Sequence, residues 1–100
     1  MRADRQRLDK WLWFARFVKS RTAAAKLVSD GFIRVNGQRN TDPAKALSVG
    51  DVLTVALDRR TLLVKVLELG TRRGPAVEAR QLYADLDSDD GTLVTSPDSG

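Results

Sequence analysis

The sequence contains neither cysteine nor histidine. Their absence excludes disulfide bonds, thiolate nucleophiles, the usual zinc sites and imidazole acid–base catalysis. Long apolar runs are also missing: no stretch reaches the roughly 18 residues that a membrane span requires, and the charged first ten residues are unlike a secretory signal. A chain without cysteine is typical of a reducing compartment, so we expect the protein in the cytoplasm.

The chain also has few of the groups that catalysis requires. Its acidic residues are scattered, Ser20 has no histidine to activate it, and neither a Walker pattern nor a G-x-G-x-x-G loop is present. With 100 residues, the chain forms one domain with a modest core. We therefore expect a binding protein rather than an enzyme, with no cofactor and no metal, and a monomer when free.

Positive charge is concentrated near the N-terminus. The net charge is +4, but residues 1–39 alone hold ten Lys or Arg against three Asp, a net +7. Such clustering favours a polyanionic partner, although solvating surface charge gives the same composition.

The other end of the chain is acidic. From residue 85 onward there are five Asp and no Lys or Arg, and residues 87–100 are rich in Ser, Asp and Gly. This composition predicts a disordered tail. One hypothesis is that the tail folds back on basic residues and weakens non-specific binding; a merely solubilising role is the simpler interpretation.

Two helices are predicted in the first third of the chain. Residues 1–6 are predicted to be a flexible N-terminus, and apolar residues at helical spacing then favour a helix over residues 7–18. Ser20 is a suitable N-cap for a second helix, because its hydroxyl accepts an orphan backbone N–H. That helix ends at Gly31, where a left-handed residue is usually needed.

Strand patterns follow. Residues 32–35 predict a short strand that ends at Asn36-Gly37, a turn signal because both residues tolerate positive φ. The remaining predicted elements are a loop at 38–47, two hairpin strands at 52–57 and 61–67, a basic loop at 71–75 and a last helix at 76–86. This order indicates an α+β domain over residues 7–86, with two N-terminal helices packed on a small twisted β-sheet and a C-terminal helix.

The junction of the two predicted helices is the leading candidate for a binding site. Lys19 and Arg21 supply charge, Ser20 and Thr22 supply hydroxyl groups, and the second helix offers the N–H groups at its start. Such a combination suits phosphate groups, although each charge taken singly is equally compatible with solvated surface. Residues that extend this face, or form a second lobe at the 36–37 turn, are Arg16, Lys26, Arg34, Gln38 and Arg39.

Trp11 falls on the apolar stripe of the first predicted helix, whereas Trp13 and Phe17 fall on the opposite side. One interpretation makes these two aromatics a stacking platform for nucleic-acid bases. We favour the other, in which they pack against Leu82 or Tyr83, because the last predicted helix needs an apolar surface to dock on.

A series of short motifs carries a family resemblance. They are Arg7-Leu8-Asp9-Lys10-Trp11-Leu12-Trp13, Ala15-Arg16-Phe17, Lys19-Ser20-Arg21, Ala24, Leu27-Val28, Gly31, Ile33-Arg34-Val35-Asn36-Gly37 and Val49-Gly50-Asp51. In this order they resemble the alpha-L RNA-binding module first described in ribosomal small-subunit protein S-four. A later block is similar to the stand-alone members, heat-shock protein fifteen and its ribosome quality-control relatives; it comprises Arg72-Arg73, Glu78-Ala79 and Leu82-Tyr83. The acidic end departs from the longer basic extension common in the heat-shock members.

The resemblance implies a function. Such modules bind structured RNA through the first two helices and the following turn. The stand-alone members bind the large ribosomal subunit, especially one that still carries a nascent chain on its tRNA, in recycling or quality control and without catalysis. The positions that match the family's RNA-facing or face-organising residues are Arg7, Asp9, Arg16, Lys19, Arg21 and Arg34. The other residues that we expect in the RNA-binding face are Lys10, Ser20, Thr22, Lys26, Asn36, Gln38 and Arg39.

The sequence is compatible with two other functions. Two helices joined by a short turn superficially suggest a helix-turn-helix DNA-binding protein, although the second helix offers few side chains that read bases. Alternatively, the chain is an RNA-guiding accessory subunit of an RNA-modifying enzyme, since modules of this kind are often fused to such enzymes.

Overall fold

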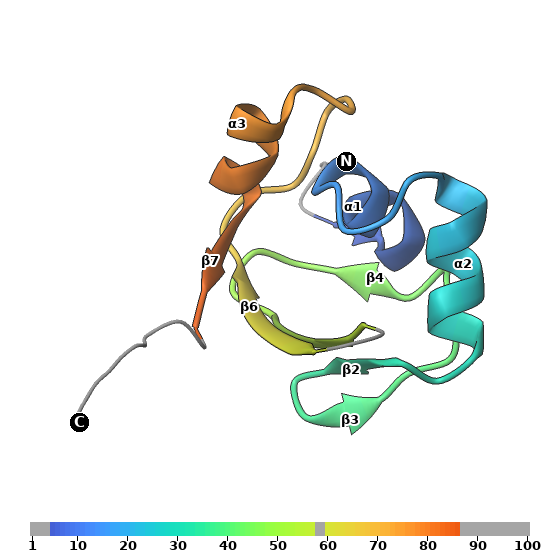
Figure 1. The fold of residues 1–100 in the computed structure, drawn as a ribbon. Helices are drawn as coiled ribbons and strands as arrows, with labels where there is room; N and C mark the ends of the chain where they lie inside the picture. The colour runs from blue at the N-terminus through green and yellow to red at the C-terminus, as the bar shows by residue number, and fades with distance from the viewer. Residues whose placement is uncertain (1–4, 58–59, 87–100) are drawn as a thin grey trace.

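The computed structural model of the protein describes residues 5–57 and 60–86. In chain order the elements are β1 (Gln6–Arg7), α1 (Leu8–Phe14), α2 (Arg21–Ser29), β2 (Ile33–Val35), β3 (Gln38–Arg39), β4 (Ala46–Leu47), β5 (Val52–Ala56), β6 (Thr61–Val66), α3 (Ala76–Ala79), the 3-10 helix η1 (Arg80–Leu82) and β7 (Tyr83–Asp85). Helix α1 lies between α2 and α3 in Figure 1. The predicted α+β class is confirmed.

The main sheet is antiparallel and has the strand order β3-β2-β5-β6-β7. Along one cross-strand row, Val35 pairs with Leu53, and Leu53 pairs with Val64. These three side chains are buried, because alternate residues of a strand point to the same face and this face is covered by the helices. Trp11 and Leu12 of α1 join them in one hydrophobic core. The core thus fixes the place of both N-terminal helices.

Helix α1 is shorter than predicted. It ends at Phe14 rather than continuing to Val18, because Arg16 adopts a left-handed conformation with φ of 64°. The N–H of Phe17 donates to the Leu12 carbonyl and the N–H of Arg16 to the Trp13 carbonyl, the pair of bonds that defines a Schellman motif. The predicted helix at residues 7–18 was therefore wrong in its last turn, since spacing alone does not reveal a left-handed arginine.

Helix α2 follows its prediction closely. It begins after the Ser20 N-cap and ends with Gly31 at φ of 88°, in a second Schellman motif. The next turn is also confirmed, because Asn36 and Gly37 have φ of 53° and 86°, as a tight hairpin turn requires.

Two predictions near the start of the sheet were wrong. The segment at 38–47 is not a plain loop, because it contains β3 and β4. Gln6, expected in a flexible N-terminus, belongs to β1, which pairs with β4 in a separate two-stranded sheet. Its side chain also exchanges two hydrogen bonds with the backbone of Gly70. Pairing across 39 and 41 positions supplies the order that the local sequence does not encode.

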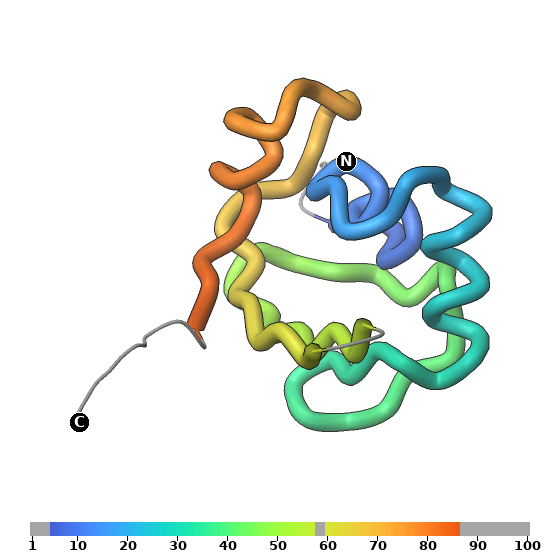
Figure 2. Tube along the Cα trace, in the orientation of Figure 1, coloured from blue at the N-terminus to red at the C-terminus, as the bar shows by residue number. Residues whose placement is uncertain are grey.

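The predicted last helix at 76–86 was wrong over most of its length. Only Ala76–Ala79 is α-helical, followed by one 3-10 turn, and Tyr83–Asp85 forms β7 along β6. Strand β6 otherwise leaves an edge of unpaired backbone groups, and pairing with β7 satisfies them. The tube in Figure 2 shows this last strand running beside β6.

Two further predictions lie outside the described residues: the tip of the hairpin at 58–59 and the acidic tail at 87–100. The hairpin strands themselves are confirmed as β5 and β6. In the described part of the chain, no helix combines the length and the apolar character that crossing a membrane requires.

Candidate nucleic-acid interface

A buried carboxylate organises two arginines beside α1. The Asp9 side chain is 5% exposed and accepts two hydrogen bonds of 3.1 Å from Arg7, while Arg21 Nε lies 3.8 Å from Asp9 Oδ2. The hydrogen bonds to Asp9 and the charge of its carboxylate raise the pKa of the Arg7 guanidinium. Arg7 and Arg21 remain about half exposed, so their remaining donors face solvent in fixed positions.

The start of α2 lies next to this group. Ser20 Oγ accepts the N–H of Ala23 at 3.0 Å, which confirms the predicted N-cap. Lys19 and Thr22 are exposed on either side of the cap. The structure therefore brings Lys19, Ser20, Arg21 and Thr22 together at a helix N-terminus, where free N–H groups and cations favour an anion.

Three other predicted residues already have partners within the protein. Lys10 Nζ lies 5.6 Å from the centre of the Phe14 ring, and Lys26 Nζ forms an ion pair of 3.1 Å with Asp30. Arg16 donates to the Gly74 carbonyl at 3.0 Å. Arg16 thus connects the end of α1 to a distant loop, whereas the charge of Lys26 is partly balanced within α2.

The second lobe lies on the β2–β3 hairpin. Arg34 and Arg39 face each other across the two strands, and Gln38 is exposed beside them. Asn36 has a structural role, because its Oδ1 accepts the Val52 N–H at 2.9 Å and its Nδ2 donates to Asp51. The amide of Asn36 is therefore engaged within the protein.

Sequence reasoning missed two basic residues. Lys45 was assigned to a loop, yet its carbonyl accepts the N–H of Leu8 at 2.9 Å, at the start of α1. Arg73 was placed in a basic loop, yet it donates to the carbonyls of Trp13 (3.2 Å) and Val18 (3.4 Å). Neither contact has a local signal, because each joins residues more than 35 positions apart.

The aromatic residues divide between two environments. Phe17 packs on Tyr83 with 4.8 Å between ring centres, and Trp11 contacts both rings, so packing is confirmed for Phe17. Trp13 instead stacks on Phe14 at 5.4 Å with the Arg73 guanidinium over its ring. Tyr83 reaches Phe17 from β7, not from the predicted helix.

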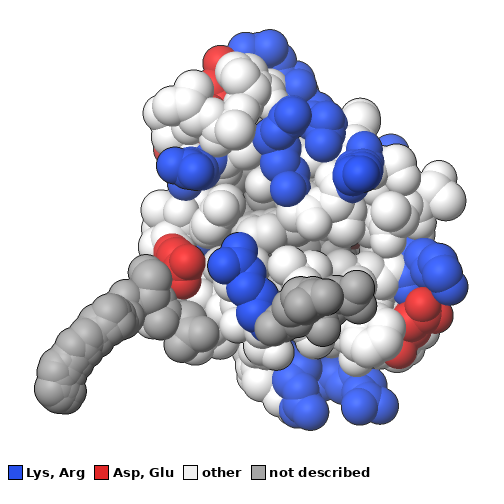
Figure 3. Space-filling model, in the orientation of Figure 1, with Lys and Arg blue, Asp and Glu red and all other residues white. Residues whose placement is uncertain are grey.

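Basic side chains gather in two regions of one face. Figure 3 shows a group of Lys and Arg over α1 and the segment that leads to α3, and another over the β2–β3 hairpin. Few acidic residues interrupt them in this view.

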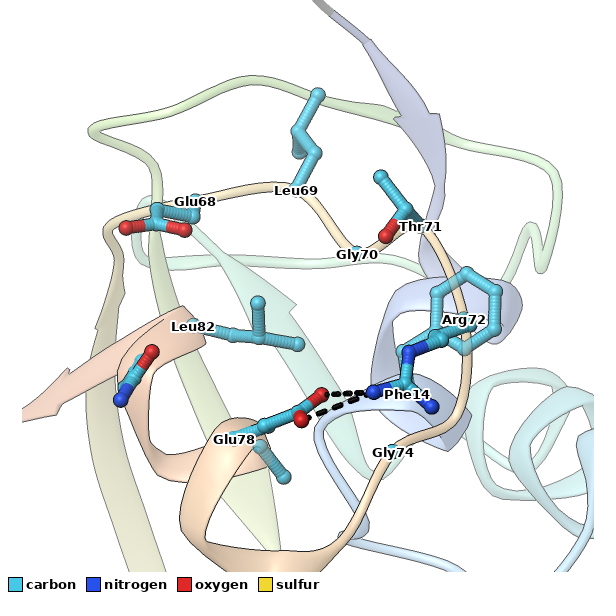
Figure 4. Close-up of a pocket in the computed structure, with 11 residues that line it drawn as sticks. Phe14, Glu68, Leu69, Gly70, Thr71, Arg72, Gly74, Glu78 and Leu82 are labelled. Atoms are coloured by element: carbon cyan, nitrogen blue, oxygen red, sulfur yellow. Dashed lines mark hydrogen bonds and ion pairs between the residues drawn. The ribbon is translucent and has the colours of Figure 1, made fainter.

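A hollow of about 480 Å³ lies between α1 and α3, and none of the predicted binding residues lines it. Figure 4 shows Phe14 and Arg72 on one side and Glu78 opposite, with both Glu78 oxygens 2.9 Å from Arg72. Among the described residues, no cluster of three or more Asp, Glu, Cys or His side chains could hold a metal ion.

Comparison with known proteins gives consistent matches. The S4 domain family matches residues 6–53. Heat shock protein 15 of Escherichia coli K12 is 43% identical over 79 residues, which cover 77% of this chain and 57% of that protein. The RQC P-site tRNA stabilizing factor of Streptococcus pneumoniae is 41% identical over 66 residues, 63% of this chain and 70% of that protein.

A solved structure is similar as well. The trimeric structure of Vibrio cholerae heat shock protein 15 superimposes with a TM-score of 0.77 at 37% identity and covers 81% of both chains. The present chain thus spans less than two thirds of the length of the Escherichia coli relative and most of the chain in the solved structure.

Proposed function

The chain belongs to the S4-domain family that includes heat shock protein 15 and the RQC P-site tRNA stabilizing factor, and on this premise we propose that it binds structured ribosomal RNA. The binding domain is residues 7–86, and the protein acts by binding rather than by catalysis. It works in the cytoplasm, on ribosomes.

One observation carries the proposal: the buried Asp9 carboxylate holds Arg7 and Arg21 beside the Ser20-capped start of α2. A carboxylate with a 5% exposed side chain is costly to bury unless it is paired, and here its partners are two half-exposed arginines. Guanidinium groups that are oriented in advance lose less side-chain entropy when they bind phosphate. This arrangement suits the phosphate backbone of RNA, which supplies much of the affinity of such interfaces.

The more specific target is the large ribosomal subunit, in particular a subunit that carries a nascent chain on its tRNA. The name of the Streptococcus pneumoniae relative refers to stabilising a P-site tRNA. The role that we propose is therefore recycling or quality control of such subunits, with tRNA as a second RNA partner.

Sedimentation tests this function. Tagged protein in cell lysate is run on sucrose gradients at low and high salt, and we expect it to migrate with free large subunits enriched in peptidyl-tRNA. High salt should release it, since each neutralised phosphate contributes a slope of about −0.7 to −0.9 to the log–log dependence of affinity on salt. Protein that stays at the top of the gradient at low salt contradicts the proposal.

Two controls address the competing functions. Duplex DNA that displaces the protein from ribosomal RNA at equal concentration would favour a DNA-binding protein, and co-purification with a modifying enzyme would favour an accessory subunit. Light scattering on free protein tests the proposed monomer, whose mass is 11.1 kDa. Three times that mass would match the trimer of the Vibrio cholerae relative.

A further inference from the structure

A small polar pocket lies apart from the α1–α2 junction. It has a volume of about 170 Å³ and lies between the β2–β3 hairpin and the segment that leads to β4; its lining residues are Val35, Asn36, Gln38, Arg39, Asn40 and Lys45. Small-molecule sites usually have about 300–1,000 Å³ and apolar or aromatic walls. No aromatic side chain lines this pocket, so it suits a small anion better than a base or a metabolite.

Among the described residues, the two cations of the pocket have no acidic partner. Arg39 and Lys45 are exposed, and within residues 5–57 and 60–86 neither side chain forms a hydrogen bond or an ion pair. The nearby acids are engaged elsewhere: Asp51 accepts from Asn36 and from the Ser48 N–H, and Asp42 accepts from the Ala44 N–H. These hydrogen bonds leave Asp42 and Asp51 charged, but among the described residues neither acid pairs with Arg39 or Lys45.

Arg34 adds a third charge at its edge. Arg34 and Arg39 are direct partners across β2 and β3, and like charges in this position destabilise a strand pair. The Arg34–Arg39 pair lowers the stability of the sheet only slightly, and an anion bound beside it would remove this destabilisation.

The backbone of Lys45 connects the pocket to the helical face. The N–H groups of Leu8 and Asp9, the first in α1, donate to the carbonyls of Lys45 (2.9 Å) and Pro43 (3.1 Å). Arg7 pairs with Ala46 in the β1–β4 ladder. The segment that positions Lys45 is therefore fixed to the same turn of chain that holds Arg7 and Asp9.

We propose that Arg39 and Lys45 bind one phosphate group of the RNA backbone, as a second anchor beside the Arg7–Asp9–Arg21 group. This inference rests on the proposed RNA-binding function and adds a residue, Lys45, that the sequence analysis placed in the predicted loop at 38–47. Gln38 supplies an amide donor at the rim of the pocket, whereas the Asn40 amide donates to the Asp42 carbonyl at 2.9 Å. The site suits a phosphate because both cations line one small pocket and neither is paired with a carboxylate of a described residue.

The experiment measures affinity for a fluorescent 12-base-pair RNA duplex over a range of salt concentrations. Lys45→Gln and Arg39→Gln should each weaken binding about tenfold, the loss typical of one hydrogen bond to a charged group. If both residues bind the same phosphate, the double variant lowers the salt slope by a single step of about 0.7–0.9, not two. Its loss of affinity is then smaller than the product of the two single losses.

Arg80→Gln is the matched control. Arg80 is exposed in η1, which directly follows α3, and Figure 1 shows α3 at the end of the molecule away from the β2–β3 hairpin. Arg80 forms no ion pair with a described residue. Its loss should change affinity by less than about twofold. Lys45→Arg and Arg39→Lys keep the charge and should retain most of the binding, and equal urea midpoints verify that all variants fold.

The outcomes separate the two proposals. If the wild type binds and Arg21→Gln weakens binding, while Lys45→Gln and Arg39→Gln behave like Arg80→Gln, the phosphate site is wrong and the RNA-binding function stands. If the double variant lowers the salt slope by two such steps instead of one, the two residues do not share a phosphate and the proposed site is wrong. If the wild type shows no salt-dependent binding to the duplex or to ribosomes, both proposals fall.

Discussion

Gln6 and Gly70 exchange two hydrogen bonds: the Gln6 side chain donates to the Gly70 carbonyl at 2.7 Å and accepts the Gly70 N–H at 3.0 Å. The Gln6 side-chain amide thus satisfies the buried backbone N–H and C=O groups of Gly70, as a neighbouring strand would. The first described residues and the segment between β6 and α3 are held together by this contact across 64 positions.

Gln6→Ala should lower the free energy of unfolding by about 1–3 kcal/mol, because it leaves two buried backbone groups without partners. Urea denaturation followed by tryptophan fluorescence measures this loss. Gln38→Ala is the control: Gln38 is exposed on the hairpin, and its change should stay below about 0.5 kcal/mol. Equal effects of the two substitutions would contradict the role of Gln6.

Gly70→Ala should destabilise the domain by about 1–3 kcal/mol through overpacking. A Cβ at this position would lie 2.5 Å from the Phe14 ring, and Phe14 is itself 5% exposed, so the ring has little room to move. Thermal unfolding of Gly70→Ala, Phe14→Leu and the double variant measures the coupling. A smaller side chain at position 14 should reduce the cost of the alanine; strict additivity would argue against the contact.

Arg73→Lys should cost about 1–2 kcal/mol, although the charge is kept. The guanidinium reaches the carbonyls of both Trp13 and Val18, and a lysine cannot reproduce this forked geometry. Arg72→Lys is the comparison, because Arg72 forms only an exposed ion pair with Glu78 and its change should cost less than about 0.5 kcal/mol. Chemical denaturation at constant ionic strength distinguishes them, and a larger loss for Arg72→Lys would reverse the assignment.

Trp11→Ala should cost about 3–5 kcal/mol, since Trp11 is fully buried in the core and its indole N–H donates to the Glu68 carbonyl at 3.0 Å. Trp13→Ala should cost clearly less, because Trp13 is only partly buried. Urea midpoints followed by circular dichroism, which does not depend on either indole, give the comparison. Similar losses at both positions would mean that the two tryptophans share the core equally.

Arg21→Gln should weaken ribosome binding with little change in the free energy of unfolding. Arg21 is 44% exposed, and Asp9 retains its two hydrogen bonds from Arg7 when Arg21 is replaced. Sedimentation with large subunits measures binding, and urea denaturation verifies the fold. The proposed face is misplaced if this variant binds like the wild type, or if it unfolds.

The local structure of the proposed interface was predictable because its signals lie within a few residues. Ser20 caps α2, Gly31 ends it and Asn36-Gly37 forms the hairpin turn, as each residue type favours. The contact between Arg7 and Asp9 is also local, because the residues are two positions apart. The sequence alone, however, does not identify which basic residue pairs with Asp9.

The amino-acid sequence by itself determined the α+β class, the two helices, the central hairpin and the basic character of the face, because periodicity, capping and turn preferences act over short distances. Tertiary structure alone decided the left-handed turn at Arg16, the strand at Tyr83–Asp85 and the place of Lys45. Each of these depends on backbone groups far along the chain: the Gly74 carbonyl, the edge of β6 and the first N–H groups of α1. A buried backbone N–H or C=O group must form a hydrogen bond, and the tertiary structure determines which partner lies within reach.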